Sequence, residues 1–551
     1  MNRRVKTALA TAMLPLSLMA SENSTLDNRN EQISKQLDLF NIIYKNLELY
    51  YVDTIPTEKA VKAGIDGMLA SLDPYTTYFP EEDEEEFKFF LSGEYAGVGA
   101  AINKVDSVVT FVEIYEGSPS QKAGLKAGDQ IIEIDGKKTE KMSTTDVSSK
   151  LRGEENTTVK LLVRNPVTKK DKKVTITREK ITLPTIEYSD TLGNGIGYIR
   201  FSSFTENSAE LFKGAFMELK KQGISSLVVD LRNNPGGLLD QAASIINNFI
   251  PNQSTIVYTD GKLKQLNMVY KATLQPIDTE IPIVVLVNRN SASASEIFSG
   301  CLQDLDRAVI VGERTYGKGL VQSTQELPFG GSLKMTTSKY YIPSGRCVQA
   351  INYAERDEEG YVKRIPDSLT KEFKTANGRI VRDGCGVSPD VNVESSKYST
   401  IAYYLYSKNI IFNYAVQYVA KHPKIAQPKD FVYNDYEEFK AYAKKQDFTY
   451  KLKTEEAIAT LKEIAKEEGY LEHSQSEFDA LEKKLSHNLD QDLEIFEKEI
   501  KSLISCEIIK QVYYQKGGIC ESLKNDKVKE EAIAILLDKK RYNEILQPQK
   551  K

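Results

Sequence analysis

The sequence predicts a multidomain protein that combines α/β and α+β parts. Its 551 residues are too many for one hydrophobic core, so several domains are expected. Strand and helix patterns alternate between residues 195 and 350, which favours parallel strands covered by helices. Short strands and turns fill the stretch 88–180, and a charged, glycine-poor stretch follows residue 400. These three changes of pattern define the fold class.

Composition excludes some functions. Apolar residues make up 40% of the chain and charged residues 27%, as in ordinary soluble globular proteins. The formal net charge is -5 and no basic stripe stands out, so nucleic acid is not an expected partner.

The N-terminus has the pattern of a secretory signal peptide over residues 1–20. Arg3, Arg4 and Lys6 precede an apolar stretch that ends in small residues before polar Ser21. This stretch is too short for a comfortable membrane span of about 20 residues. No later segment is apolar enough to cross a bilayer. We therefore expect an exported protein with no membrane span after signal cleavage.

Residues 28–87 are predicted to be a helical segment. Apolar residues recur every three or four positions from Leu37 to Tyr50 and again from Val61 to Leu72. Asp73-Pro74 ends the second run, because the residue before a proline disfavours helix.

The next two domains are expected at 88–180 and 181–397. The first carries alternating strand patterns and one helix near Ser143–Leu151. The second alternates strands and helices, with buried-type strands at Gly197–Phe201, Ser226–Asp230 and Ile283–Val287. That alternation predicts a parallel sheet with helical layers.

The last domain, 398–551, is predicted to be helical. One apolar face continues over six turns from Phe478 to Ile500, which indicates a long helix. Packing into a core is favoured over binding a partner, and the sequence does not indicate the role of this region.

Histidine placement restricts the chemistry. The three histidines are His422, His473 and His487, all in or beside the helical tail, so a Ser-His-Asp triad within the α/β region is impossible. No CxxC spacing or histidine cluster suggests a metal site. The five cysteines could include the pairs Cys347–Cys385 or Cys506–Cys520, and the odd count leaves at least one thiol unpaired.

Three segments of the α/β region carry candidate chemistry. SASASEI, residues 291–297, lies where a strand leads into a helix and could present a serine nucleophile. Lys318, between two glycines, is a candidate base. A free lysine would need its pKa lowered by roughly three units, about 4 kcal/mol, which desolvation can supply. Gln322 could hold the lysine side chain, and the glycine-rich turn 230–237 could stabilise an oxyanion with its amides.

Together, SASASEI and GKGLVQ resemble the signature of the carboxy-terminal processing proteases, the tail-specific S41 serine peptidases of the Ser/Lys type. The resemblance implies that Ser293 is the nucleophile, Lys318 the base and Gln322 the residue that orients it. It implies oxyanion donors at the amides of Ala294 and Gly237, with Gly236 as an alternative. It also implies a ClpP/crotonase-like core, a bacterial periplasmic location and a possible homodimer, with no metal and no cofactor.

The resemblance extends to a PDZ module in residues 88–180. Gly97, Val98, Gly99 and Ala100 would form the loop that captures a substrate's C-terminal carboxylate. The expected substrates are proteins with exposed nonpolar C-termini, and the module could also gate the active site. Two departures from the family pattern are Asn290, where glycine is common, and Cys385 in a turn that is usually all glycine.

Two other functions remain open at this point. A noncatalytic PDZ scaffold could keep a degenerate protease fold for binding alone. An acyl-CoA enzyme could use a similar α/β core, but no GxxxxGK[ST] or GxGxxG motif is present.

Overall fold

The computed structural model describes residues 29–81, 88–89, 92–328, 330–356, 362–394, 397–446, 448–485 and 487–548. The expected signal peptide, residues 1–20, lies outside this described part. The chain divides into two compact units, Met1–Tyr78 and Phe79–Lys551. Among the described residues, no helix is both long enough and apolar enough to span a membrane.

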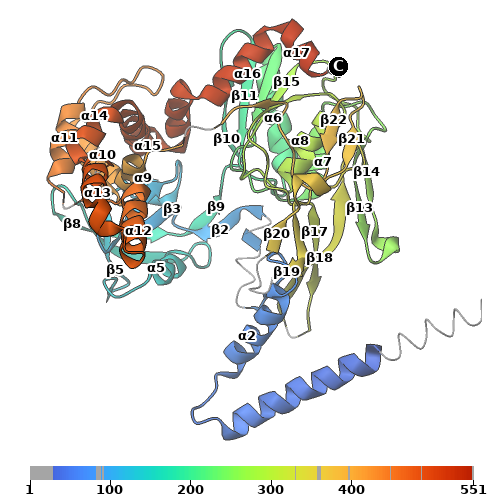
Figure 1. The fold of residues 1–551 in the computed structure, drawn as a ribbon, viewed down its shortest axis with the longest axis horizontal. Helices are drawn as coiled ribbons and strands as arrows, with labels where there is room; N and C mark the ends of the chain where they lie inside the picture. Colours follow the sequence, from blue (N-terminus) through green and yellow to red (C-terminus); the bar gives the residue numbers. More distant parts are fainter. Residues whose placement is uncertain are drawn as a thin grey trace, which may run out of the picture. The chain divides into compact units, whose positions relative to one another are not determined.

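The first unit contains the two predicted N-terminal helices, drawn in blue in Figure 1. They cover residues 29–50 and α2, Thr57–Ala70. Leu37, Phe40 and Ile43, which define the apolar face of the first helix, are 64%, 54% and 51% exposed. The apolar spacing therefore correctly predicts the helix, but its apolar face is largely exposed.

A six-stranded sheet forms the centre of the second unit. Its strand order is β10-β11-β12-β15-β16-β23, in which β10 is antiparallel and the other five strands run parallel. This parallel arrangement is the one that the strand–helix alternation predicts. The strands are β10 Ile186–Thr191, β11 Ile196–Phe201, β12 Ser226–Asp230, β15 Ile283–Val287, β16 Val309–Gly312 and β23 Val391–Asn392.

Helices cover both faces of this sheet. In β15, Ile283, Val285 and Val287 join the core under one helical layer, while Val284 and Leu286 join the core under the other. The first layer contains α6 Ser208–Lys221, α7 Leu239–Ile246 and α8 Ala294–Asp304. The second contains the end of α15 Glu497–Ser522, with α16 Lys527–Leu537 and α17 Lys539–Ile545. The C-terminal end of the chain thus completes the central domain (Figure 1).

A second sheet lies beside the first and was not anticipated. Its strand β18 pairs with β17 and β13, and β13 pairs with β14. The segments are polar and half-exposed, so they lack the apolar runs that reveal a buried strand. The elements are β13 Thr255–Gly261, η2 Lys264–Leu266, β14 Val269–Lys271, β17 Leu320–Glu326 and β18 Ser332–Tyr341, followed by β19 Ile351–Arg356, β20 Val362–Arg364, η3 Asp367–Leu369, β21 Glu372–Lys374 and β22 Ile380–Arg382.

A small β-rich module occupies the region where the PDZ domain is expected. Its sheet has the order β3-β4-β5-β7-β8, so β3 is an edge strand. β2 Glu94–Gly97 pairs with β9 Glu179–Thr182 where the chain enters and leaves the module. The elements are β3 Ala100–Val105, β4 Val108–Ile114, α4 Pro119–Lys122, β5 Gln130–Ile134, β6 Lys137–Lys138, α5 Thr144–Leu151, β7 Thr158–Arg164 and β8 Asp171–Thr177.

The C-terminal region is helical, but the single long helix expected from Phe478 to Ile500 is wrong. Asn488 caps α14 by accepting hydrogen bonds from two backbone amides, and Phe496 separates α14 from α15. Leu481 and Leu485 are about 40% exposed, whereas Leu493 and Ile500 are fully buried. The remaining helices are α9 Thr400–Ser407, α10 Ile410–Lys421, α11 Tyr436–Lys444, α12 Lys453–Glu467, α13 Leu471–Leu485, α14 Leu489–Ile495 and η4 Leu523–Asn525. With these helices, the predicted fold class is confirmed.

Candidate active site

Ser293 lies at a strained turn between β15 and α8. It is the N-cap residue of α8 and has φ 56° and ψ -115°, values that residues other than glycine rarely adopt. All eleven residues of α8 are buried. The packing of the helix therefore holds the serine in this conformation.

A glycine turn, Asn233–Gly237, passes directly against Ser293, and we call it the strap. Gly236 has φ 104°, and a Cβ atom there would lie 2.6 Å from the Ala292 carbonyl oxygen and 2.7 Å from Ser293 Cβ. Gly237 has φ 139°, and its Cβ would lie 2.3 Å from the Phe204 carbonyl oxygen. Only glycine fits at both positions, because of the backbone angles and the close contacts.

The two strap glycines use their amides differently. The Gly236 amide donates to Asn234 Oδ1 at 2.9 Å. Among the described residues, no partner accepts a hydrogen bond from the amide of Gly237 or of Ala294. Gly236 is thus engaged within the strap, which favours Gly237 over Gly236 as an anion donor.

Asparagines fasten the strap to the serine turn. The Asn234 carbonyl oxygen accepts from the Ala292 amide at 3.1 Å and from Ser295 Oγ at 3.0 Å. Asn233 Oδ1 accepts from the side-chain amides of Asn288 and Asn290, both at 2.9 Å. The departure at Asn290 therefore adds a strap contact that a glycine could not make.

Lys318 lies in the loop between β16 and β17, and its side chain is half-buried. Its Nζ donates to Gln322 Oε1 at 2.8 Å. Gln322 Nε2 donates in turn to Thr336 Oγ1 on β18 at 3.1 Å. The unanticipated second sheet thus fixes the amide that contacts the lysine.

Glu296 connects the serine turn with the lysine loop. Its Oε2 accepts from the amides of Ser293 at 2.9 Å and Lys318 at 2.8 Å. Its Oε1 accepts from Thr315 Oγ1 at 2.6 Å and from the Gly317 amide at 2.7 Å. Burial raises the pKa of this carboxyl above its usual value, although the four hydrogen bonds favour the carboxylate. One fully buried side chain therefore sets the spacing of the two loops.

The other two serines of the motif serve packing. Ser291 Oγ donates to the Leu231 carbonyl oxygen at 2.8 Å, and Ser295 Oγ donates to Asn234 as described. Both are completely buried, whereas Ser293 is partly accessible. This difference in burial distinguishes Ser293 from the other two serines of the motif.

The loop 97–100 of the β-rich module is braced from one side. The Val98 and Gly99 carbonyl oxygens accept from the amides of Ser120 at 2.9 Å and Tyr115 at 3.1 Å. Gly99 has φ 72°, and a Cβ there would lie 2.4 Å from Ser118 Cβ. Within the described part of the chain, neither the Val98 nor the Gly99 amide donates a hydrogen bond. The loop therefore presents backbone donors beside the edge strand β3.

The five cysteines are free thiols. Cys347 and Cys385 belong to neighbouring segments, since the Gly384 amide donates to the Cys347 carbonyl oxygen at 2.9 Å. Burial raises the pKa of the Cys347 thiol. Neither of the two cysteine pairs considered from the sequence is bonded in this structure.

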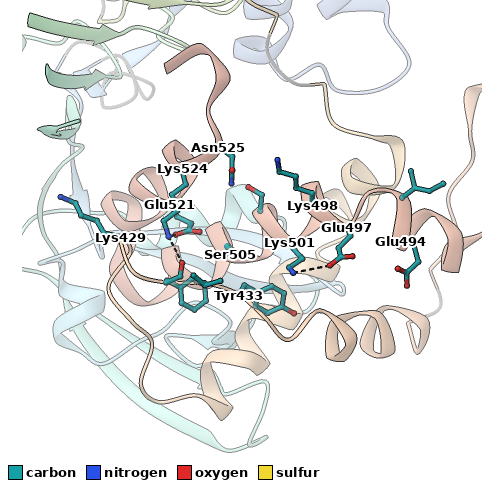
Figure 2. A pocket seen from close by; sticks show the side chains of 14 residues that line it. Lys429, Tyr433, Glu494, Glu497, Lys498, Lys501, Ser505, Glu521, Lys524 and Asn525 are labelled. Carbon is teal, nitrogen blue, oxygen red and sulfur yellow. Dashed lines mark hydrogen bonds and ion pairs between the residues drawn. The ribbon is translucent and has the colours of Figure 1, made fainter. Parts of the chain in front are cut away.

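A cavity of about 670 Å³ lies in the C-terminal helical region, away from these residues (Figure 2). Several of its charged side chains are paired: Lys501 with Glu497 at 3.4 Å, and Lys524 with Glu521 at 2.7 Å. None of the predicted site residues lines it. The cavity does not explain the motifs of the α/β region.

Sequence reasoning missed three residues that shape the site: Asn234, Thr315 and Thr336. Asn234 lies inside the glycine-rich motif, so its position was a usable signal. Thr336 could not be found, because its contact with Gln322 depends on the pairing of β17 with β18.

Three family models match the chain. Residues 195–357 match "Peptidase family S41", residues 110–165 match "PDZ domain" and residues 401–536 match "Probable PDZ-protease, C-terminal helical domain". The matches cover the α/β core, the β-rich module and the helical region.

Curated relatives agree with these models. The chain is 34% identical over 355 residues to a carboxy-terminal-processing protease of Bartonella bacilliformis, covering 64% of this chain and 81% of that protein. It is 31% identical over 399 residues to a "Probable CtpA-like serine protease" of Staphylococcus aureus strain bovine RF122, covering 72% and 73%. A solved photosystem II D1 C-terminal processing protease is 28% identical, with a TM-score of 0.36 and coverage of 64% and 86%.

Proposed function

Because the chain belongs to the carboxy-terminal-processing proteases of peptidase family S41, and is a serine-type peptidase, we propose that Ser293 is its nucleophile and Lys318 its general base. The observation that carries this assignment is the position of Glu296. Its one carboxylate holds the backbone of both residues, at 2.9 Å and 2.8 Å. Two loops of the sheet are thereby joined around a serine that the turn exposes.

The proposed reaction is acyl transfer in two steps. Neutral Lys318 takes the Ser293 hydroxyl proton while Oγ attacks the scissile carbonyl carbon. The oxyanion accepts hydrogen bonds from the amides of Gly237 and Ala294, neither of which has a described protein partner. The lysine then gives its proton to the leaving amine, so that an acyl-enzyme remains. Water, deprotonated by the same lysine, releases the product and restores Ser293.

Gln322 has an orienting role in this proposal. Its Oε1 accepts from Lys318 Nζ at 2.8 Å, and its amide group is fixed by Thr336. This restricts the lysine side chain, which otherwise has four rotatable bonds and a high conformational entropy. The reaction as proposed uses no metal and no cofactor.

We further propose that the PDZ module selects substrates by their nonpolar C-termini. The Val98 and Gly99 amides would bind the terminal carboxylate, and the peptide would add as a strand to β3, the edge of the sheet. Binding there could also gate cleavage. Mutation of the 97–100 loop should then slow cleavage of tailed proteins more than cleavage of unstructured ones, and equal losses would contradict gating.

The N-terminal part of the chain supports a proposal on location and assembly. We propose export through the signal peptide 1–20 and a periplasmic location, in keeping with the bacterial source of the relatives. The exposed apolar face of residues 29–50 supports pairing with a second copy as a homodimer. Sedimentation of the wild type and of Leu37→Glu tests the dimer, which the substitution should weaken.

Degradation of a denatured protein such as casein tests the central assignment. Wild type should degrade it, while Ser293→Ala and Lys318→Ala should not. A noncatalytic PDZ scaffold would degrade nothing in any sample. Unchanged degradation by Ser293→Ala would place the nucleophile elsewhere.

A further inference from the structure

Arg232, which directly precedes the strap, contacts two carboxylates that lie far apart in the sequence. Its Nε lies 2.9 Å from Oδ1 of Asp230 and its Nη2 lies 2.6 Å from Oδ2, at the end of β12. Its Nη1 and Nη2 also donate to Oδ1 and Oδ2 of Asp526 at 3.0 Å and 2.6 Å. The C-terminal helical region thus reaches the edge of the proposed active site.

This ion pair is well shielded and has defined geometry. The side chains of Arg232 and Asp526 are 15% and 13% exposed. A two-point contact between guanidinium and carboxylate fixes orientation as well as distance. Burial alone would raise the pKa of Asp230, but Arg232, together with Arg200 and Tyr198, holds that pKa below the ordinary value. Arg232 is therefore a fixed cation between two carboxylates.

Asp526 is itself held rigidly. It caps α16 by accepting from the amides of Val528 at 3.0 Å and Lys529 at 3.1 Å. Val528 and Ala532 of this helix are buried against the central sheet, beside β15 (Figure 1). The carboxylate that binds Arg232 therefore belongs to a packed layer.

The strap depends on its neighbours for position. Gly236 and Gly237 have no side chains to anchor them, and after them the Leu238 amide donates to the Phe204 carbonyl oxygen at 2.7 Å. Before the strap, the Leu231 amide donates to the Leu286 carbonyl oxygen at 2.9 Å, and Arg232 follows. Asn233 and Asn234 tie the middle of the strap to the serine turn, and Arg232 adds a further anchor at the end where the strap leaves β12. The position of such donors matters, because small displacements of an oxyanion donor reduce catalysis strongly.

We propose that Asp526 is a positioning residue for the strap and that the C-terminal helical region is thereby a working part of the active site. Through Arg232, Asp526 keeps the Gly237 amide where it stabilises the oxyanion. This inference rests on the proposed function, because it takes the strap as the oxyanion donor. It assigns a catalytic contribution to a region whose role the sequence did not indicate.

Asp526→Asn provides a sharp test, because asparagine keeps the helix cap while the charge of the pair is lost. The matched control is Asp190→Asn, which breaks another ion pair between the C-terminal region and the sheet, Lys429–Asp190 at 2.8 Å, on the edge strand β10. With a short unstructured peptide substrate, Asp526→Asn should lower kcat about tenfold and leave KM within about twofold. Asp190→Asn should leave kcat unchanged.

The inhibition constant of a peptide aldehyde provides a second measurement, which should not change if Asp526 has a purely structural role. The aldehyde's hemiacetal with Ser293 places an oxygen at the strap, so Asp526→Asn should weaken inhibition about tenfold while substrate KM stays level. Equal effects of Asp526→Asn and Asp190→Asn, or unchanged kcat and inhibition, would overturn the inference. If the asparagine variant does not fold, Asp526→Ser, which also keeps a helix cap, replaces it. Failure of both variants to fold would show that the Arg232–Asp526 pair serves folding and would overturn the positioning role. Full activity of Ser293→Ala would instead overturn the proposed function.

Discussion

The strap and the 97–100 loop are both glycine-rich turns, but they are built differently. The strap is joined to the serine turn by Asn233 and Asn234, and Arg232 secures it from outside. In the 97–100 loop, strand pairing holds Gly97 and Ala100, and the Val98 and Gly99 carbonyl oxygens accept hydrogen bonds, but the Val98 and Gly99 amides donate to no described residue. The difference fits the two proposed roles: an oxyanion donor must be fixed before the reaction, whereas a tail-binding loop must leave amides free for the peptide carboxylate.

Loss of the reacting groups should have the largest effect. Ser293→Ala and Lys318→Ala should each lower kcat/KM for casein-derived peptides by at least about 10³-fold, because each removes a participant in proton transfer. Lys334→Met alters another half-buried lysine, on β18, and serves as the control that should retain activity. Substantial turnover by Lys318→Ala would mean that another base acts.

Gly237→Ala should follow. An added Cβ would lie 2.3 Å from the Phe204 carbonyl oxygen at φ 139°, so the strap must move. We expect a loss of about 10²-fold in kcat, in line with removal of one oxyanion donor. Gly214→Ala, at an open position within α6, is the matched control and should leave kcat unchanged. Normal kcat in Gly237→Ala would show that the strap does not bind the oxyanion.

Glu296→Gln should have an intermediate effect. The amide retains the size of the side chain but presents one acceptor oxygen to four donors. We expect kcat to fall about tenfold and the thermal midpoint to fall as well. Glu507→Gln, a carboxyl in α15 that accepts from Gln511, controls for loss of a partly buried charge. A wild-type kcat in Glu296→Gln would show that the active arrangement of the two loops does not depend on this carboxylate.

The same variant should change the pH dependence of stability. Because the folded pKa of Glu296 is raised, its stabilising contribution is present at low pH and is lost as pH rises through that pKa. The opposite holds for Asp230, whose lowered pKa stabilises the fold above the ordinary carboxyl range. The deficit of Glu296→Gln in thermal midpoint should therefore be larger in acid than at neutral pH. A deficit that does not vary with pH would contradict the shifted ionisation of Glu296.

The smallest effect should come from the recognition loop. Gly99→Ala places a Cβ 2.4 Å from Ser118 Cβ at φ 72°, so the loop must distort. We expect a several-fold rise in KM for a protein with a nonpolar tail and little change for an unstructured peptide. Gly136→Ala, in an open turn of the same module at φ 76°, is the control. Equal losses of activity on the tailed protein and on the unstructured peptide would show that the 97–100 loop has no separate role in recognising tails.

The sequence pointed to the two candidate catalytic loops, but not to the residues that support them. Ser293 and Lys318 could be selected because no histidine is available and their flanking residues form a motif. The choice between Gly236 and Gly237 required the contact from Gly236 to Asn234, which depends on the turn geometry. The pairing of Arg232 with Asp526, 294 residues away, required the docking of α16 on the sheet. Long-range contacts of this kind leave no periodic pattern in either segment.

The helical tail shows the other limit. Its apolar spacing correctly predicted helix, but Asn488 and Phe496 divide the expected helix, and Tyr514, at φ 57°, interrupts α15. Asn488 is a usual N-cap residue, so that break had a local signal. The interruption at Tyr514 had no local sequence signal. It became apparent only with the tertiary contacts of Tyr514, including the one with Gln121 of the β-rich module.

The most direct test of the central claim is the rate at which a fluorophosphonate phosphonylates the enzyme, with loss of fluoride, followed by mass spectrometry from about pH 6 to about pH 9. We predict labelling at Ser293 in the wild type, faster as the lysine loses its proton, and loss of this pH-dependent labelling in Lys318→Ala. Equal rates in the two proteins, or labelling at a different residue, would contradict a Ser293–Lys318 mechanism.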